Sequence, residues 1–136
     1  MARSIEREHA FIMAFEQMFR PELSVMDIAA LAADAEVFDA EPFAVSLAQT
    51  VCDHTDDADE LIRPRLRNWT IDRLAAETLC VLRLGICEMK YSGGVTPVGV
   101  CINECVELAK NYCPARDAGF VNGILGAIAR ADEAQE

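Results

Sequence analysis

The stretch from Thr70 to Gly94, TIDRLAAETLCVLRLGICEMKYSGG, decides the fold. Its apolar side chains recur at helical spacing, and Ser92, Gly93 and Gly94 then interrupt the pattern. We therefore predict a long helix that begins at Thr70 and ends near Tyr91. The residues on its apolar side are Leu74, Val81, Leu82, Ile86 and Met89.

Six further helices are predicted around this one, and no segment of useful length alternates with the period of two that strands show. Capping residues and prolines set their limits. They are residues 4–19 with Ser4 as N-cap, 24–33 with Ser24 and Asp27 as a capping box, a helix opened by Pro42, residues 57–68 with a kink at Pro64, a helix opened by Thr96-Pro97, and residues 115–131. The prediction is an all-α fold of about seven helices packed as bundles, in one domain over residues 1–136 with a frayed tail at 131–136.

The composition is that of a globular, cytoplasmic protein. It has 52% hydrophobic residues, no apolar run of membrane length and no signal-like N-terminus. Twelve Lys and Arg oppose 23 Asp and Glu, so bulk attraction to nucleic acid is not expected. However, 11 of the acids lie between Arg20 and Arg63, where there is no base. This acidic segment, 21–62, is either a partner surface or a solvated face, and the rest of the surface is free to be locally basic.

The chain carries no recognisable catalytic, phosphate-binding or cofactor-binding motif. Its six cysteines include no C-x-x-C pair, which favours buried apolar thiols over a metal or redox site. His9 has no evident nucleophile partner, so a helix-surface or capping role is favoured over general-base catalysis. We expect a binding protein, not an enzyme, with no cofactor and no metal.

Three ordered blocks in the second half resemble the NusB transcription antitermination family. The first contains Ile71-Asp72-Arg73-Leu74, Val81-Leu82-Arg83-Leu84 and Glu88-Met89. The second is Pro97 with Cys101-Ile102-Asn103-Glu104 and Val106-Glu107-Leu108-Ala109-Lys110, and the third is Phe120-Val121-Asn122-Gly123-Ile124-Leu125. The resemblance covers about residues 70–130 and is weak across 21–62, while Arg7-Glu8-His9-Ala10 lies where the family opens its first helix.

The resemblance implies two small three-helix bundles and a role without catalysis. NusB-like proteins bind single-stranded boxA RNA together with NusE, a small-subunit ribosomal protein. That assembly joins the elongating RNA polymerase and suppresses termination, notably in ribosomal RNA operons. The implied partners are therefore boxA RNA, NusE and the RNA polymerase elongation complex, with no membrane, while a homodimer stays open.

Six residues are candidates for RNA binding, because single-stranded RNA is held by cations on phosphates and by rings stacked on bases. Arg3 and Arg7 lie one helical turn apart, so both can face the same phosphate backbone. Arg83, Tyr112 and Phe120 match family positions, and Arg116 lies in the loop between the last two helices. The structural alternatives are a core position for Phe120, and for Arg83 an ion pair with Glu88 or Glu104.

The first helix carries fewer arginines than is typical of the family, with Ile5 and Glu6 where bases or small residues are common. RNA binding is therefore expected to be weak alone and to depend on NusE. Three rivals remain. They are a protein–protein scaffold that has lost its RNA site, the same helical module of an RNA-modifying methyltransferase, and a thiol or metal enzyme. The methyltransferase reading is disfavoured, because 136 residues leave no room for a catalytic domain.

Overall fold

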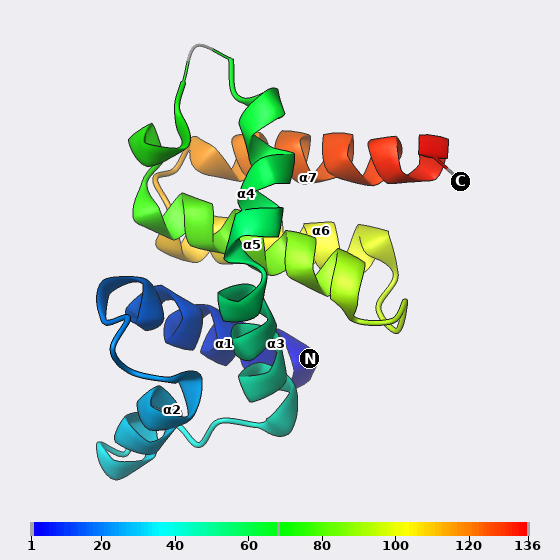
Figure 1. Cartoon of the computed structure of the whole chain (residues 1–136). Coiled ribbons are helices and arrows are strands. Elements are labelled where there is room, and N and C mark those ends of the chain that lie inside the picture. Colours follow the sequence, from blue (N-terminus) through cyan, green and yellow to red (C-terminus); the bar gives the residue numbers. More distant parts are fainter. Residues whose placement is uncertain (1, 68, 136) are drawn as a thin grey trace. The chain divides into compact units, whose positions relative to one another are not determined.

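The computed structural model describes residues 2–67 and 69–135, and in this part of the chain the regular elements are all helical (Figure 1). The all-α prediction is confirmed. The elements are α1 (Ala2–Phe19), α2 (Val25–Asp34), α3 (Pro42–Asp53), α4 (Thr55–Ile62), α5 (Ala76–Tyr91), α6 (Val98–Tyr112) and α7 (Asp117–Gln135), with two short 3-10 segments, η1 (Arg63–Arg65) and η2 (Ile71–Arg73). None of the described helices is both long and apolar enough to span a membrane.

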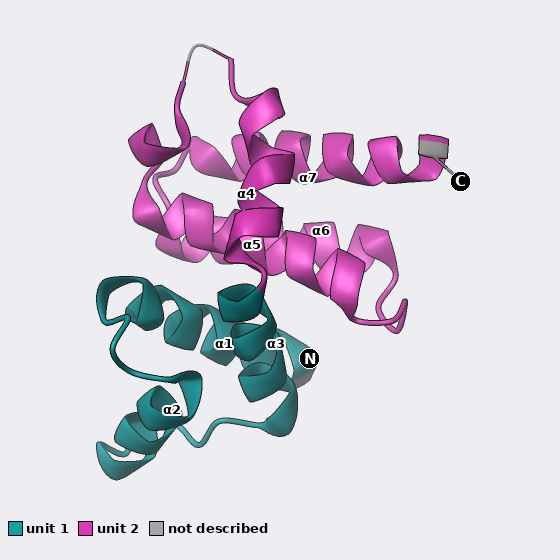
Figure 2. Ribbon diagram, viewed as in Figure 1, with its two compact units in different colours: residues 1–53 teal, residues 54–136 magenta. Residues whose placement is uncertain are grey.

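The chain forms two compact units, residues 1–53 and 54–136 (Figure 2). In the first unit, α1, α2 and α3 all pack against one another. Its buried side chains include Ala10, Phe11, Met13 and Ala14 of α1, Val25 and Ile28 of α2, and Ala44, Leu47, Ala48 and Val51 of α3. The apolar faces of the three helices thus pack together into one core, as the helical period of the sequence predicts.

In the second unit, α5 is the central helix and packs against α4, α6 and α7. Leu82, Leu84 and Ile86 are almost completely buried. Gly85 lies where α5 packs tightly against α6 and α7. A Cβ built at this position would lie 2.8 Å from Cδ1 of Leu125 in α7 and 2.9 Å from Sγ of Cys105 in α6. A Cβ at residue 85 would therefore require the side chains of Leu125 and Cys105 to shift.

Two predicted helix starts are confirmed in detail. The Ser24 hydroxyl accepts a hydrogen bond from the Asp27 N–H, and the Asp27 carboxylate accepts one from the Ser24 N–H, both at 3.0 Å. This reciprocal pair is the capping box expected at α2. Pro42 is the first residue of α3, where its missing N–H costs no helical hydrogen bond.

The predicted long helix from Thr70 is shorter than expected. Thr70 lies outside α5, and its side chain hydrogen-bonds Asp72. This bond, helped by a backbone hydrogen bond and the charge of Arg73, lowers the pKa of Asp72 against the opposing effect of burial. Such local side-chain bonds compete with helix formation. Residues 71–73 form η2, Leu74 is extended, and α5 begins only at Ala76.

Other helix limits also differ from the prediction. Ser4 lies inside α1 and does not cap it, because α1 already begins at Ala2. Pro64 falls in η1, beyond the end of α4 at Ile62, since proline cannot continue the helical hydrogen bonds. The tail expected to fray from residue 131 is helical to Gln135. An ion pair at 2.9 Å between Lys90 of α5 and Asp132 ties this last turn to the unit.

Candidate nucleic-acid interface

The first unit presents Arg3 at the start of α1, held above an aromatic ring. Its guanidinium carbon lies 4.1 Å from the ring centroid of Phe43 in α3. This is cation–π geometry, which favours a flat guanidinium against the ring. The position of Phe43 beneath the arginine is visible only in the tertiary structure.

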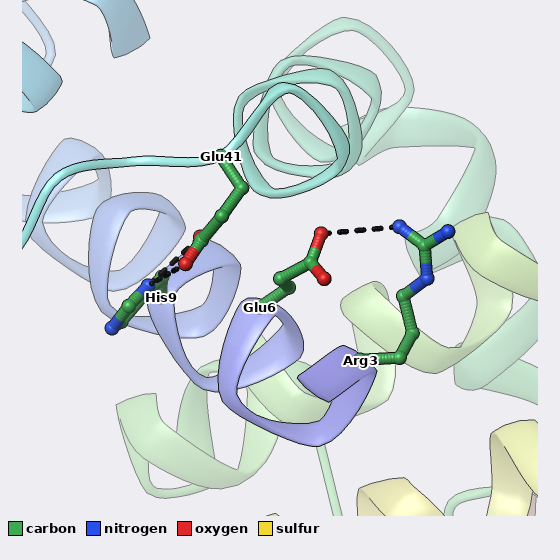
Figure 3. Close-up of polar contacts among 4 residues, drawn as sticks. All are labelled: Arg3, Glu6, His9 and Glu41. Atoms are coloured by element: carbon green, nitrogen blue, oxygen red, sulfur yellow. Dashed lines mark hydrogen bonds and ion pairs between the residues drawn. The ribbon is translucent and has the colours of Figure 1, made fainter. Parts of the chain in front are cut away.

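An acid on the same helix also engages Arg3. Its Nη1 donates to Oε1 of Glu6 at 3.1 Å, one turn along α1 (Figure 3). Half of the Arg3 side chain is exposed. An exposed pair of this kind contributes little to stability and can exchange for another partner. Arg3 is therefore an accessible cation whose resting partner is a carboxylate that a phosphate could replace.

Arg7 differs from Arg3, although the sequence predicts that both face one phosphate backbone. Arg7 is only 3% exposed, and its guanidinium carbon lies 5.5 Å from the Phe43 ring centroid. Burial of a guanidinium requires compensating partners, and Arg7 has further interactions within the described residues. The exposed cation at this end of α1 is therefore Arg3.

His9, on the next turn of α1, has a structural position. Its ring stacks on that of Phe38 with centroids 4.1 Å apart and planes 7° apart. Its Nδ1 lies 2.9 Å and 3.0 Å from the two carboxylate oxygens of Glu41, just before α3 (Figure 3). Burial would raise the pKa of Glu41, but its bond to His9 and a backbone hydrogen bond lower it overall. His9 thus joins α1 to the start of α3.

In the second unit, Arg83 is part of a buried ion pair. Its Nε and Nη2 donate to the two carboxylate oxygens of Asp59 in α4, at 2.9 Å and 2.8 Å. The two side chains are only 13% and 8% exposed. Arg83 therefore forms an internal ion pair, as the structural alternative expected, but its partner is Asp59 and not Glu88 or Glu104. Arg83 links α4 to α5 from within.

The other three candidates gather where α6 gives way to α7. Tyr112 is the last residue of α6 and 36% exposed, Arg116 is exposed in the connection, and Phe120 is half-buried in the first turn of α7. Phe120 is half-buried, so it lies neither fully in the core nor fully at the surface. This α6–α7 junction, residues 112–120, thus combines two rings and an exposed cation, the side chains that hold single-stranded RNA.

A buried threonine that the sequence analysis overlooked fixes the junction. The Thr78 hydroxyl donates to Oδ2 of Asp117 at 2.7 Å, joining α5 to the first residue of α7. Thr78 itself is completely buried. It also hydrogen-bonds Cys113, although burial dominates and raises the pKa of that thiol. A polar residue on the apolar side of a long helix was the available signal, since buried hydroxyls need partners.

The cysteines of the described residues are free thiols, and most of them are buried. Cys80, Cys87, Cys101 and Cys105 are buried, and no cysteine of the described residues is in a disulfide. Burial raises the pKa of Cys52, as it does that of Cys113. A raised pKa opposes formation of the thiolate that nucleophiles and metal ligands require. Within residues 2–67 and 69–135, three or more His, Cys, Asp or Glu never cluster as a metal site would require.

Comparison with known sequences decides the family. The sequence profile of the NusB family matches residues 5–130. The chain belongs to the NusB family. The transcription antitermination protein NusB of Bacillus subtilis is 37% identical over 131 residues, which cover 94% of this chain and 95% of that protein. The NusB protein of Myxococcus xanthus is 44% identical over 93 residues, which cover 68% of this chain and 66% of that protein.

Solved structures agree with this membership of the NusB family. T. maritima NusB has a TM-score of 0.78 at 29% identity, covering 94% of this chain and 90% of that one. A chain in the crystal structure of the antitermination factors NusB and NusE in complex with dsRNA has a TM-score of 0.79 at 27% identity, covering 96% of this chain and 99% of that one.

NusB-family membership confirms the resemblance and extends it. The matched residues include the acidic segment 21–62, so the expectation of only a weak resemblance there is corrected. In the structure this segment forms α2, α3 and α4. Only the few side chains that face a core are constrained by packing, so a helix can keep its place while its exposed residues become acidic.

Proposed function

We propose that this NusB-family chain is a transcription antitermination factor that binds boxA RNA of nascent ribosomal transcripts together with NusE and acts on the elongating RNA polymerase. The observation that carries the proposal is the family match over residues 5–130. A structural relative that was crystallised with NusE and double-stranded RNA supports both partners.

Four exposed or half-exposed side chains are proposed to touch the RNA. Arg3 would exchange Glu6 for a phosphate while Phe43 keeps its guanidinium oriented. At the α6–α7 junction, Arg116 would bind a second phosphate, and Tyr112 and Phe120 would stack on bases that are not paired. Arg7 and Arg83 are buried, so we assign them a supporting role beneath the RNA surface.

Only two of the four candidate cations, Arg3 and Arg116, are exposed, which predicts weak binding by the chain alone. Each neutralised phosphate contributes a slope of about −0.7 to the dependence of log affinity on log salt for single strands. A protein with two such contacts gains little from counterion release at physiological salt. NusE is therefore proposed to supply part of the binding surface, and tight binding is expected only for the pair.

The test is titration of a labelled single-stranded boxA oligomer with the chain, with NusE and with both, across a salt series. The proposal expects tight binding only with both proteins, and weaker binding of a scrambled oligomer and of a double-stranded version. Sub-micromolar binding by the chain alone in physiological salt would contradict the dependence on NusE. Sedimentation of the free chain in the same buffers shows whether a homodimer accompanies weak binding.

A second candidate is a protein–protein scaffold of the same fold with little or no RNA binding. Burial of Arg7 and Arg83 favours it, because it removes two of the four candidate cations from the surface. A scaffold would bind NusE equally well with and without RNA, and the labelled oligomer would stay free in every titration.

A further inference from the structure

The connection between α4 and α5 differs in charge from the rest of this acidic chain. Residues 63–73, read as RPRLRNWTIDR, contain four of the 12 basic residues and a single acid. They include η1 and η2, and the structure describes all of them except Asn68. We call residues 63–67 and 69–73 the basic connector.

The connector also carries the only tryptophan of the chain, and it is exposed. Trp69 is 55% exposed, a high value for the largest side chain. Tryptophan is rarely left in water without a reason, since its ring is the largest apolar surface a residue can bury. Like Arg63, Arg67 and Arg73, it lies at the surface of the second unit.

Two of the arginines have local partners that orient them. Arg63 donates to Oε1 of Glu60 at 2.8 Å, and Arg65 donates to the carbonyl of Leu61 at 2.9 Å. Arg67 has no such bond among the described residues. An exposed ring with guanidinium groups on either side in the chain is the combination that holds a single strand, with the ring stacking on a base and the cations on phosphates.

The connector is joined to the α6–α7 junction through the first turn of α5. Arg73 ends η2, and α5 begins three residues later at Ala76. Thr78, in the first turn of α5, is hydrogen-bonded to Asp117 at the start of α7. The five residues from Arg73 to Thr78 can span at most about 18 Å. A single strand held at the junction could therefore continue to Arg73, the last residue of the connector.

We propose that the basic connector is a further binding site for single-stranded RNA, in which Trp69 stacks on a base and Arg67 and Arg73 bind phosphates, so that the strand held at the α6–α7 junction continues across it. This rests on the proposed function and adds a contact to the six residues expected from the sequence. A protein partner would need apolar neighbours around the ring, whereas the exposed neighbours of Trp69 in the connector are mostly polar or charged.

Trp69 provides its own test, because it is the only tryptophan and its fluorescence reports on this position alone. The boxA oligomer is titrated into the chain with NusE, while Trp69 emission and the anisotropy of the labelled RNA are followed. The W69L variant with NusE serves as the blank. The proposal expects saturable quenching with the same midpoint as the anisotropy, because a stacked base quenches the ring.

Substitutions then measure the contribution of each group. W69L is expected to weaken RNA binding by about fivefold or more, the effect of losing one stacked base. R67Q and R73Q should each reduce the magnitude of the salt slope by about 0.7. The matched controls are Y91L, an exposed ring at the end of α5, and R130Q, an exposed arginine of α7. Both should bind as the unaltered chain does. Circular dichroism shows that each variant is folded.

Three results would overturn the inference. RNA that binds by anisotropy without changing Trp69 emission, and equally well to W69L, would keep the proposed function and exclude the connector. If Trp69 emission changes on addition of NusE alone, and the W69L variant no longer binds NusE, the connector is a site for the protein partner and not for RNA. Absence of RNA binding in every titration would exclude the proposed function and the connector together.

Discussion

Arg83 of α5 and Asp59 of α4 form a two-bond ion pair, with Nε to Oδ1 at 2.9 Å and Nη2 to Oδ2 at 2.8 Å, almost closed to solvent. Removing one partner leaves a buried charge without compensation. We expect Asp59→Ala to lower the free energy of unfolding by about 3–5 kcal/mol. Urea unfolding followed by circular dichroism measures it.

Two further variants test this interpretation. Asp57→Ala removes an exposed acid of the same helix, which pairs with His54 at 3.3 Å, and should cost less than about 1 kcal/mol. The double variant Asp59→Leu/Arg83→Met replaces both charges with apolar side chains and should recover most of the lost stability. A double variant as unstable as Asp59→Ala would show that the charges themselves are required.

Arg3 is expected to contact a phosphate. Arg3→Gln should weaken binding of boxA RNA by the chain with NusE and reduce the magnitude of the salt slope by about 0.7, because one phosphate contact is lost. Arg20→Gln is the matched control, since Arg20 is equally exposed and also pairs with a nearby acid, Glu22. Equal loss in both variants would indicate general electrostatics, not a contact at Arg3.

Glu6 should oppose RNA binding because its carboxylate pairs with the Arg3 guanidinium, which a phosphate would have to bind. Glu6→Gln removes the competing charge while keeping the shape of the side chain. We expect severalfold tighter RNA binding, strongest at low salt, where exposed charges act most. The increase should vanish in the Arg3→Gln background. A gain that survives there would mean that Glu6 repels the RNA directly.

Acid should weaken the first unit through Glu41. Its pKa in the folded chain lies below the ordinary value of 4.5. A lowered acid pKa gives stability that is complete above that value and lost as pH falls through the folded pKa. Unfolding measured between about pH 6 and pH 3 should show this loss, and Glu41→Gln should flatten it. An unchanged pH profile in that variant would contradict the role given to the bond with His9.

Thr78 should stabilise the α6–α7 junction. Thr78→Val keeps the shape of the side chain but removes the donor to Asp117, and a hydrogen bond to a charged group contributes about 2 kcal/mol. Thermal unfolding should show the loss. Thr50→Val, whose hydroxyl donates to the Ser46 carbonyl in its own helix, is the control and should cost much less. Equal losses of stability in the two variants would mean that the hydrogen bond from Thr78 to Asp117 contributes no more than a local bond within a helix.

The sequence predicted the helices because each carries its own periodic pattern and its own end signals. The capping box of Ser24 and Asp27 and the proline at residue 42 are local, so their outcome did not depend on distant residues. The start of α5 was misplaced because the bond between Thr70 and Asp72 opposes a helical continuation, and a hydrophobic pattern does not report such a bond.

The candidate site was predicted by residue type but not by exposure. Arg3 and Arg7 look alike in the sequence, and only packing made one accessible and buried the other. The partner of Arg83 was missed for the same reason, since Asp59 lies 24 residues away and nothing local connects them.

By itself, then, the sequence determined the all-α architecture, the family and the chemical character of the groups proposed to bind RNA. These depend on periodicity and on the types of side chain, which are local properties. The tertiary structure decided which cations are free to bind, which ring lies under Arg3, and that Thr78 fixes the junction. Those outcomes depend on contacts between residues far apart in the chain, where burial and geometry determine what each charge can do.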